Sequence, residues 1–225
     1  MNYKTSLMVL ICLMFQTPAY ANLISNGSFE DITNFVDNGQ NTMVVAPGGS
    51  ALTGWQVVTN ELAWIGPANP FSVFAPIGGG SYFLDLTSYT DSAPFAGVTQ
   101  TIVTTAGQQY TLEFDLGSSS QYGQPVALQA AAGSLNQSFT SPLSGLNLWQ
   151  HISTTFTATG PTTLISLQGT QGGSYIGLDN VIVNANGGTP PPSVPESGSL
   201  ALLVIGLAGN LYMRRRNGVI GPVAI

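Results

Sequence analysis

The sequence predicts an all-β fold, a two-sheet antiparallel sandwich, with a signal helix before it and one apolar helix after it. Residues 22–186 show no helical periodicity, and their apolar residues form short runs between Gly, Ser, Thr, Asn and Gln. The run 109–117 alternates apolar with polar side chains, which is typical of a strand with one face in a core. These residues contain no cysteine, so we expect one domain held together by its core.

Residues 1–21 have the pattern of a secretory signal peptide. Lys4 precedes the apolar stretch 7–15, and Ala19-Tyr20-Ala21 offers a small-x-small cleavage site. A retained membrane anchor is the alternative, but this stretch is too short for a hydrocarbon core of about 30 Å. We expect a mature chain that begins at Asn22, which removes Cys12, the only cysteine.

The body, residues 22–186, should contain about eight strands, which fit a two-sheet sandwich. The clearest candidates are 81–86, 96–103, 109–117, 126–131, 151–158, 162–168 and 177–183. A disordered secreted segment is the alternative. Phe83, Phe114 and Phe156 all occupy apolar positions of these strands, which argues against disorder.

The charge pattern excludes one class of partner. Residues 22–198 carry all ten carboxylates of the chain and no Lys or Arg. Such a body repels phosphate groups, and it has no cationic side chains that could displace the counterions of a nucleic acid. We therefore expect no nucleic-acid binding. The four basic residues are Lys4, Arg214, Arg215 and Arg216, at the two ends of the chain.

The C-terminal region has three parts: a Pro/Gly-rich linker (187–198), an apolar helix with its arginine cluster (199–216) and a short tail (217–225). The apolar residues 199–213 would form a helix of about 22 Å, enough for a tilted or transient membrane anchor. The arginines should then lie in the cytoplasm and the body outside. A buried core helix is the alternative, which the linker and the abrupt arginine cluster disfavour.

Val194, Pro195 and Glu196, followed by the apolar helix and by Arg214, Arg215 and Arg216, resemble the PEP-CTERM sorting signal. The resemblance implies processing by an exosortase and delivery to the cell surface or the exopolysaccharide matrix. Ser197 stands where that motif usually has a second proline, and the tail continues beyond the arginines.

A second resemblance covers the body. Its short motifs occur in the order 22–30, 54–55, 82–86, 98–102, 107–115, 149, 156–158 and 178–183. This succession is similar to the galactose-binding-like jelly rolls of carbohydrate-binding modules and of the related choice-of-anchor C group. The resemblance implies binding of extracellular polysaccharide and a structural calcium, but no required cofactor. Glu30 and Asp179 match the expected calcium ligands, with Asp31 as an alternative to Glu30; otherwise Asp179 caps a turn.

Catalysis is not expected. His151 is the only histidine and lies in a strand-like run, and no Gly-x-Ser-x-Gly elbow accompanies it. Glu113 and Asp115 would be about 6.6 Å apart on one strand face, where side chains point in parallel and do not converge on a glycosidic bond.

Sugar sites use flat aromatic faces with a few polar partners. The candidates outside the expected core strands are Trp64, Tyr89, Tyr122 and Tyr175, with Gln121 as a polar partner. Packing is the alternative role for each, and Trp55 and Trp149 are expected in the core. The function predicted is a non-catalytic carbohydrate-binding protein of the cell surface or matrix. The alternatives are a self-associating structural matrix protein and, more remotely, a glycan-degrading enzyme.

Overall fold

The computed structural model describes residues 22–141 and 144–186. The expected signal peptide, linker, sorting motif, apolar helix and tail lie outside these residues. No helix within the described ranges has the length and apolar character needed to cross a membrane.

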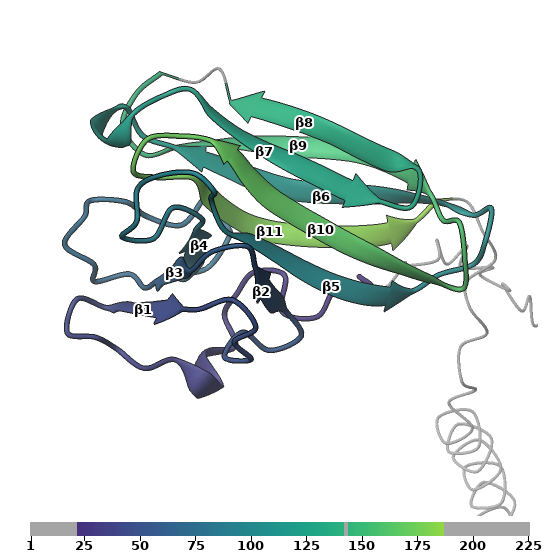
Figure 1. The fold of residues 1–225 in the computed structure, drawn as a ribbon, viewed down its shortest axis with the longest axis horizontal. Helices are drawn as coiled ribbons and strands as arrows, with labels where there is room; N and C mark the ends of the chain where they lie inside the picture. Colours follow the sequence, from purple (N-terminus) through teal and green to yellow (C-terminus); the bar gives the residue numbers. More distant parts are fainter. Residues whose placement is uncertain (1–21, 142–143, 187–225) are drawn as a thin grey trace, which may run out of the picture. The chain divides into compact units, whose positions relative to one another are not determined.

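The described residues form two antiparallel sheets, shown in Figure 1. Sheet A has the strand order β1-β3-β4-β11-β6-β9, and sheet B has the order β2-β5-β10-β7-β8. The strands are β1 (Thr42–Val45), β2 (Gln56–Val58), β3 (Leu62–Ile65), β4 (Phe83–Asp85), β5 (Gly97–Val103), β6 (Gln109–Ser118), β7 (Val126–Ala132), β8 (Leu135–Ser141), β9 (Leu148–Thr157), β10 (Thr162–Gln171) and β11 (Gly177–Ala185). Two short 3-10 helices, η1 (Ile32–Asn34) and η2 (Ser120–Tyr122), complete the described elements.

The chain alternates between the sheets in the manner of a jelly roll. Strands β4, β6, β9 and β11 lie in sheet A, whereas β5, β7, β8 and β10 lie in sheet B. Only the β7–β8 connection in this set is a hairpin within one sheet. The expected two-sheet jelly-roll sandwich is therefore confirmed. Each of the seven strands predicted from the sequence overlaps a strand of the structure.

The main core fills the space between the two sheets, and strand parity decides which side chains enter it. In β6, Tyr110, Leu112, Phe114 and Leu116 are buried in this core. In β9, Ile152 and Phe156 take the inner face, so Trp149 lies on the other side. Trp149, which was expected in the core, is partly buried against a second hydrophobic core, and its indole N–H donates to the carbonyl of Phe74 at 2.8 Å.

A second, smaller core covers one end of the outer face of sheet A. Its buried residues are Ala63, Ile65, Val73, Phe83 and Tyr175. Because the main core packs against their other faces, β3 and β4 are buried on both sides. This double burial places the last residue of β4 in an environment that has little contact with bulk water.

Candidate ligand pocket

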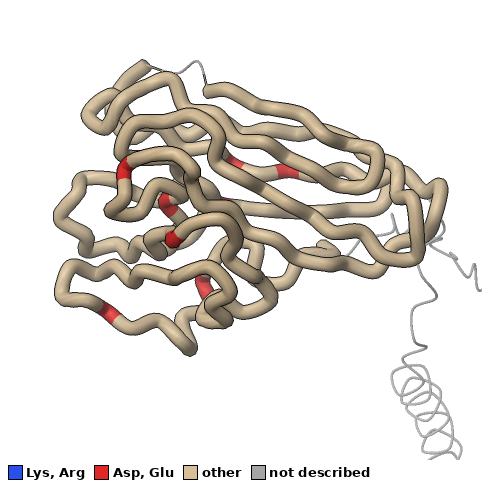
Figure 2. Tube along the Cα trace, viewed as in Figure 1, with Lys and Arg blue, Asp and Glu red and all other residues tan. Residues whose placement is uncertain are grey.

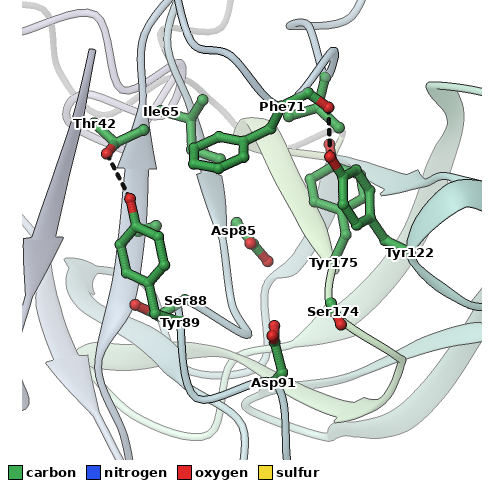
Figure 3. A pocket seen from close by; sticks show the side chains of 12 residues that line it. Thr42, Ile65, Phe71, Asp85, Ser88, Tyr89, Asp91, Tyr122, Ser174 and Tyr175 are labelled. Atoms are coloured by element: carbon green, nitrogen blue, oxygen red, sulfur yellow. Dashed lines mark hydrogen bonds between the residues drawn. The ribbon is translucent and has the colours of Figure 1, made fainter. Parts of the chain in front are cut away.

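A pocket with a cavity volume of about 120 Å³ opens beside the second core (Figure 3). Tyr89, Tyr122 and Tyr175, which the sequence singled out, all line this one pocket. They come from three separate connections: β4–β5, β6–β7 and β10–β11. The complete lining is Thr42, Ala63, Ile65, Phe71, Val73, Asp85, Ser88, Tyr89, Asp91, Tyr122, Ser174 and Tyr175.

Asp85 lies at the centre of the pocket because of its position in β4. Phe83 and Asp85 share the outer face of sheet A, whereas Leu84 between them enters the main core. The neighbours of Asp85 in the sheet are Ala63 on β3 and Gly177 on β11. The small side chain of Ala63 leaves space beside the carboxylate, whereas the missing side chain of Gly177 makes room for the Tyr175 hydroxyl.

The two carboxylate oxygens of Asp85 have different surroundings. Oδ1 accepts hydrogen bonds from the backbone N–H of Thr87 at 3.0 Å, the hydroxyl of Thr87 at 2.9 Å and the backbone N–H of Ile176 at 3.0 Å. Oδ2 accepts none from any described residue, and Figure 3 shows the carboxylate among the pocket side chains. The side chain is thus fixed through one oxygen and leaves the other for a ligand.

Burial raises the pKa of Asp85 to about 7, against the opposing effect of its hydrogen bonds with Thr87 and Ile176. The negative charge of Asp91 adds to this increase. Asp85 is only 5% exposed, so few water molecules can compensate its charge. A partly ionised, buried carboxylate with a free oxygen favours a bound donor or cation.

Aromatic rings form the walls of the pocket. Phe71 and Tyr89 meet with ring centroids 6.2 Å apart, and Tyr122 and Tyr175 with centroids 6.3 Å apart. The Tyr122 hydroxyl donates to the carbonyl of Phe71 at 2.6 Å, and the Tyr89 hydroxyl lies 3.0 Å from the hydroxyl of Thr42. These hydrogen bonds, drawn in Figure 3, hold two of the rings in place before any ligand binds.

Tyr175 is the most buried of the three tyrosines, and its hydroxyl has no hydrogen-bond partner among the described residues. Burial, followed by the charges of Asp85 and Asp179, raises the pKa of Tyr175 well above its ordinary value. The ring fits here because two neighbours are glycines: a Cβ on Gly117 would lie 2.9 Å from the Tyr175 hydroxyl, and one on Gly177 would overlap it.

The charge around the pocket is uniformly negative. Asp91 is exposed at its rim, and Glu61 accepts a hydrogen bond from the hydroxyl of Ser88 at 3.1 Å. Figure 2 shows acidic residues and no Lys or Arg within residues 22–141 and 144–186. No described lysine or arginine neutralises Asp85 or Asp91.

The other two sugar-binding candidates lie outside the pocket. Trp64 is fully buried, and its indole N–H donates to the carbonyl of Phe29 at 3.0 Å. The parity of β3 turns Leu62 and Trp64 into the main core, so the expectation that Trp64 stacks on a sugar was wrong. Gln121 is exposed next to the pocket, where its amide N–H donates to the hydroxyl of Tyr122 at 3.3 Å.

Sequence reasoning did not select Phe71, Asp85, Asp91 or Ser174 as pocket residues. For Asp85 a signal was present, because this carboxylate stands within the apolar run 82–86. A charged residue inside a buried strand needs a compensating partner, which makes it a candidate for function.

The expected calcium ligands surround a glycine loop at a different place. Asp179 in β11 has no exposed surface, and burial raises its pKa to about 9, with added contributions from Asp115 and Glu30. Its Oδ1 accepts the backbone N–H of Asn180 at 2.7 Å, while Oδ2 has no partner among the described residues. A buried carboxylate oxygen without a partner fits a hard cation.

Glu30 meets the same loop from the other side. Its Oε1 accepts the backbone N–H groups of Ser81 and Tyr82, each at 2.6 Å. A Cβ on Gly79 would lie 2.7 Å from Asp179 Oδ2, and one on Gly80 would overlap the Glu30 carboxylate. The chain within the described ranges holds no group of three His, Cys, Asp or Glu arranged for a metal, so calcium here would also need backbone carbonyls.

Asp31, the alternative to Glu30, has another role in the structure. It is the N-cap of η1, where its Oδ1 accepts the hydroxyl of Thr33 at 2.6 Å. This side-chain hydrogen bond is the main cause that lowers the pKa of Asp31.

His151 and the carboxylates of β6 form a polar group on the outer face of sheet A. His151 Nδ1 lies 2.9 Å from Asp115 Oδ1, and Asp115 Oδ2 accepts the side-chain amide of Asn180 at 2.7 Å. Glu113 accepts the hydroxyl of Ser153 at 3.2 Å. The His151 side chain is 59% exposed, and this group lies apart from the residues that line the pocket.

Solved structures similar to this chain include several carbohydrate-binding modules. A CBM4 module is 18% identical with a TM-score of 0.39, covering 72% of this chain and 99% of its own. A CBM61 module in complex with β-1,4-galactotriose is 17% identical with a TM-score of 0.41, covering 74% and 99%. A family 35 module from Clostridium thermocellum is 10% identical with a TM-score of 0.40, covering 63% and 96%.

Structural similarity at these identities and TM-scores supports no conclusion about the ligand or the chemistry of this chain. A comparison with curated protein sequences finds no match. Residues 22–183, however, match the family described as "Protein of unknown function (DUF642)". That match spans nearly all the described residues, and the chain therefore belongs to the DUF642 family.

Proposed function

We propose that this domain is a non-catalytic carbohydrate-binding module whose sugar site is the pocket around Asp85. The observation that carries the proposal is the free Oδ2 of Asp85 among the rings of Tyr89, Tyr122 and Tyr175. Sugars combine an apolar C–H face, which packs on aromatic rings, with hydroxyl donors that a carboxylate accepts. Both partners of such a contact are present in one cavity.

The dimensions of the pocket favour one sugar ring. Its volume of about 120 Å³ is well below that of a site for a drug-sized ligand, roughly 300 Å³ or more. A single sugar unit at the end or at a branch of a glycan suits this space better than the middle of a long polysaccharide.

Binding without catalysis fits the arrangement of the carboxylates. Glycoside cleavage uses a pair of carboxyl groups on opposite sides of the scissile bond. Glu113 and Asp115 are neighbours on one strand face and are hydrogen-bonded to Ser153, His151 and Asn180. In the pocket, Oδ1 of Asp85 is held by three hydrogen bonds, which suits a fixed acceptor.

The proposal also includes a location. Residues 1–21 would direct export, and Val194 to Glu196 with Arg214 to Arg216 would mark the chain for an exosortase. The module would then reach the cell surface or matrix after a transient stay in the membrane. Its partner there would be extracellular polysaccharide.

Retention on polysaccharide columns tests the site directly. Tyr89→Ala in the mature chain should weaken retention at least fivefold, a loss of about 1 kcal/mol for one aromatic contact. Phe74→Ala is the matched control, because Phe74 is 51% exposed and does not line the pocket. Thermal unfolding of each variant checks the fold. Equal retention of wild type and Tyr89→Ala would refute this assignment of the site.

A further inference from the structure

When Asp85 is ionised, the pocket contains a negative charge that no cationic side chain of the described residues balances. Asp85 is 5% exposed, its Oδ2 has no hydrogen-bond partner among the described residues, and the other charged side chain of the described lining is also a carboxylate, Asp91. Lys and Arg are missing from all the described residues. Three donors compensate Oδ1, so Oδ2 is the atom at which a donor or a cation of a ligand would further stabilise the ionised form.

Two carboxylates in one pocket also determine what the pocket excludes. A uronic acid or a sulfated sugar would place a third negative charge beside Asp85 and Asp91 in a region of low dielectric constant. The described lining offers no guanidinium or ammonium group to hold such an anion. Acidic sugars are therefore poor ligands for this site.

The walls favour a positive charge for an independent reason. Phe71, Tyr89, Tyr122 and Tyr175 surround the cavity, and the face of an aromatic ring attracts a cation within about 6 Å of its centre. Aromatic rings together with a carboxylate form a suitable environment for an organic ammonium group. A neutral sugar would use only the packing surface and the hydrogen-bond acceptor.

We propose that the pocket selects an amino sugar with a free ammonium group, which binds Asp85 while the sugar ring packs on the aromatic walls. This inference rests on the proposed carbohydrate-binding function and defines the class of sugar. Asp91 at the rim strengthens the selection, but less than Asp85, because Asp91 is exposed and more strongly screened by water and salt.

The selection should depend on pH. The titratable groups that face Asp85 in the pocket are Asp91 and the hydroxyl-bearing side chains of Tyr89, Tyr122 and Tyr175; β3 contributes only Ala63 and Ile65 to the lining. The pKa of Asp85 is raised to about 7, so its negative charge develops between about pH 6 and pH 8. A ligand with a permanent positive charge should bind more tightly across that interval.

Calorimetric titration of the mature chain tests the proposal. The probes are glucosamine and galactosamine, their N-acetyl counterparts, which have the same ring without the charge, and glucuronate. At pH 7 one of the amino sugars should bind about tenfold more tightly than its N-acetyl form, and glucuronate should bind most weakly. Tetramethylammonium, whose charge does not titrate, should bind more tightly at pH 8 than at pH 6.

Two variants locate the effect. Asp85→Asn keeps the size of the side chain and should reduce the preference for the amino sugar to less than about twofold, while the N-acetyl sugar still binds. Asp91→Asn should reduce the preference partly, and Phe74→Ala should leave it unchanged. Asp91→Asn also keeps the test decisive if Asp85→Asn does not fold, which thermal unfolding would reveal.

The outcomes separate the two proposals. Equal or tighter binding of the N-acetyl sugars, or a preference that survives Asp85→Asn, would overturn selection of a cation and leave carbohydrate binding intact. Selection of a cation would also be overturned if none of the five sugars binds while Tyr89→Ala still weakens retention on polysaccharide. Loss of both sugar binding and polysaccharide retention would instead refute the proposed function.

Discussion

Asp85 and Asp179 are two buried aspartates of the same sheet, and they differ in what their free oxygen faces. In both, burial raises the pKa, to about 7 for Asp85 and about 9 for Asp179, and Oδ1 accepts two backbone N–H groups in Asp85 and one in Asp179. Oδ2 of Asp85 adjoins a pocket with aromatic walls, whereas Oδ2 of Asp179 is enclosed near Gly79 and has no described partner. The first can bind an organic group, whereas the second has no exposed surface through which such a group could reach it.

The free energy of unfolding should depend on pH in a different range for each of the two aspartates. Of the effects predicted here, we expect this one to be the largest. A raised pKa means that the folded state keeps a proton that the unfolded chain has released, so the free energy of unfolding falls as pH rises. The decrease should extend from about pH 4 to pH 7 for Asp85 and to about pH 9 for Asp179. Because one pKa unit is equivalent to about 1.4 kcal/mol and each pKa rises by several units, each aspartate should contribute roughly 3 kcal/mol or more.

Chemical unfolding of wild type, Asp85→Asn and Asp179→Asn at several pH values, with a chelator present, measures this difference. Asp179→Asn should remove the decrease above pH 7, and Asp85→Asn should remove part of it below pH 7. A wild-type protein with constant stability from pH 5 to pH 9 would contradict the burial assigned to both carboxylates.

A side chain added at Gly79 should disturb Asp179 and leave the pocket around Asp85 intact. A Cβ on Gly79 would lie 2.7 Å from both Asp179 Oδ2 and Pro76, closer than nonbonded atoms approach. Gly79→Ala should therefore lower the free energy of unfolding by about 2 kcal/mol. The matched control is Gly160→Ala, where the nearest atom would be 3.7 Å away. Equal thermal midpoints for the two variants would show that the loop is not packed against Asp179.

Calcium should produce the smallest effect and should act only at Asp179. At pH 8, millimolar calcium should stabilise the wild type by about 1 kcal/mol or more if the ion binds the folded state alone. Asp179→Asn should lose this stabilisation, whereas Asp85→Asn should keep it. Identical melting curves with calcium and with a chelator would argue against a calcium site formed by Glu30 and Asp179.

The sequence predicted strands well where a single face is buried. Strand β6 shows the alternation clearly, because Tyr110, Leu112, Phe114 and Leu116 face the core. Strands β1, β2, β3 and β8 were not predicted. All four residues of β3 are buried, and burial on both faces removes the period of two. Strand β4 is also buried on both faces but was predicted, because it lies within the apolar run 82–86. The double burial of β3 also explains why Trp64 was wrongly expected to stack on a sugar. Trp64 faces the main core and its strand neighbours Ala63 and Ile65 face the second core, which the local sequence does not reveal.

The pocket was predicted only in part. Tyr89, Tyr122 and Tyr175 were selected as aromatic residues of connecting segments, and the structure brings them together. Their proximity follows from the jelly-roll crossovers, which join residues distant in the chain. The central role of Asp85 depends on the small neighbours Ala63 and Gly177, and strand pairing alone determines those neighbours.

The three tyrosines of the pocket lie on three independent connections, whereas Asp85 belongs to a paired strand. Substitutions in one connection can therefore alter one wall without changing the sheet pairing or the other walls. In related chains, selection could vary the preferred sugar by changing one connection at a time, while the position of the carboxylate stays constant. The strand and the connections would then evolve at different rates, the strand slowly and the walls quickly.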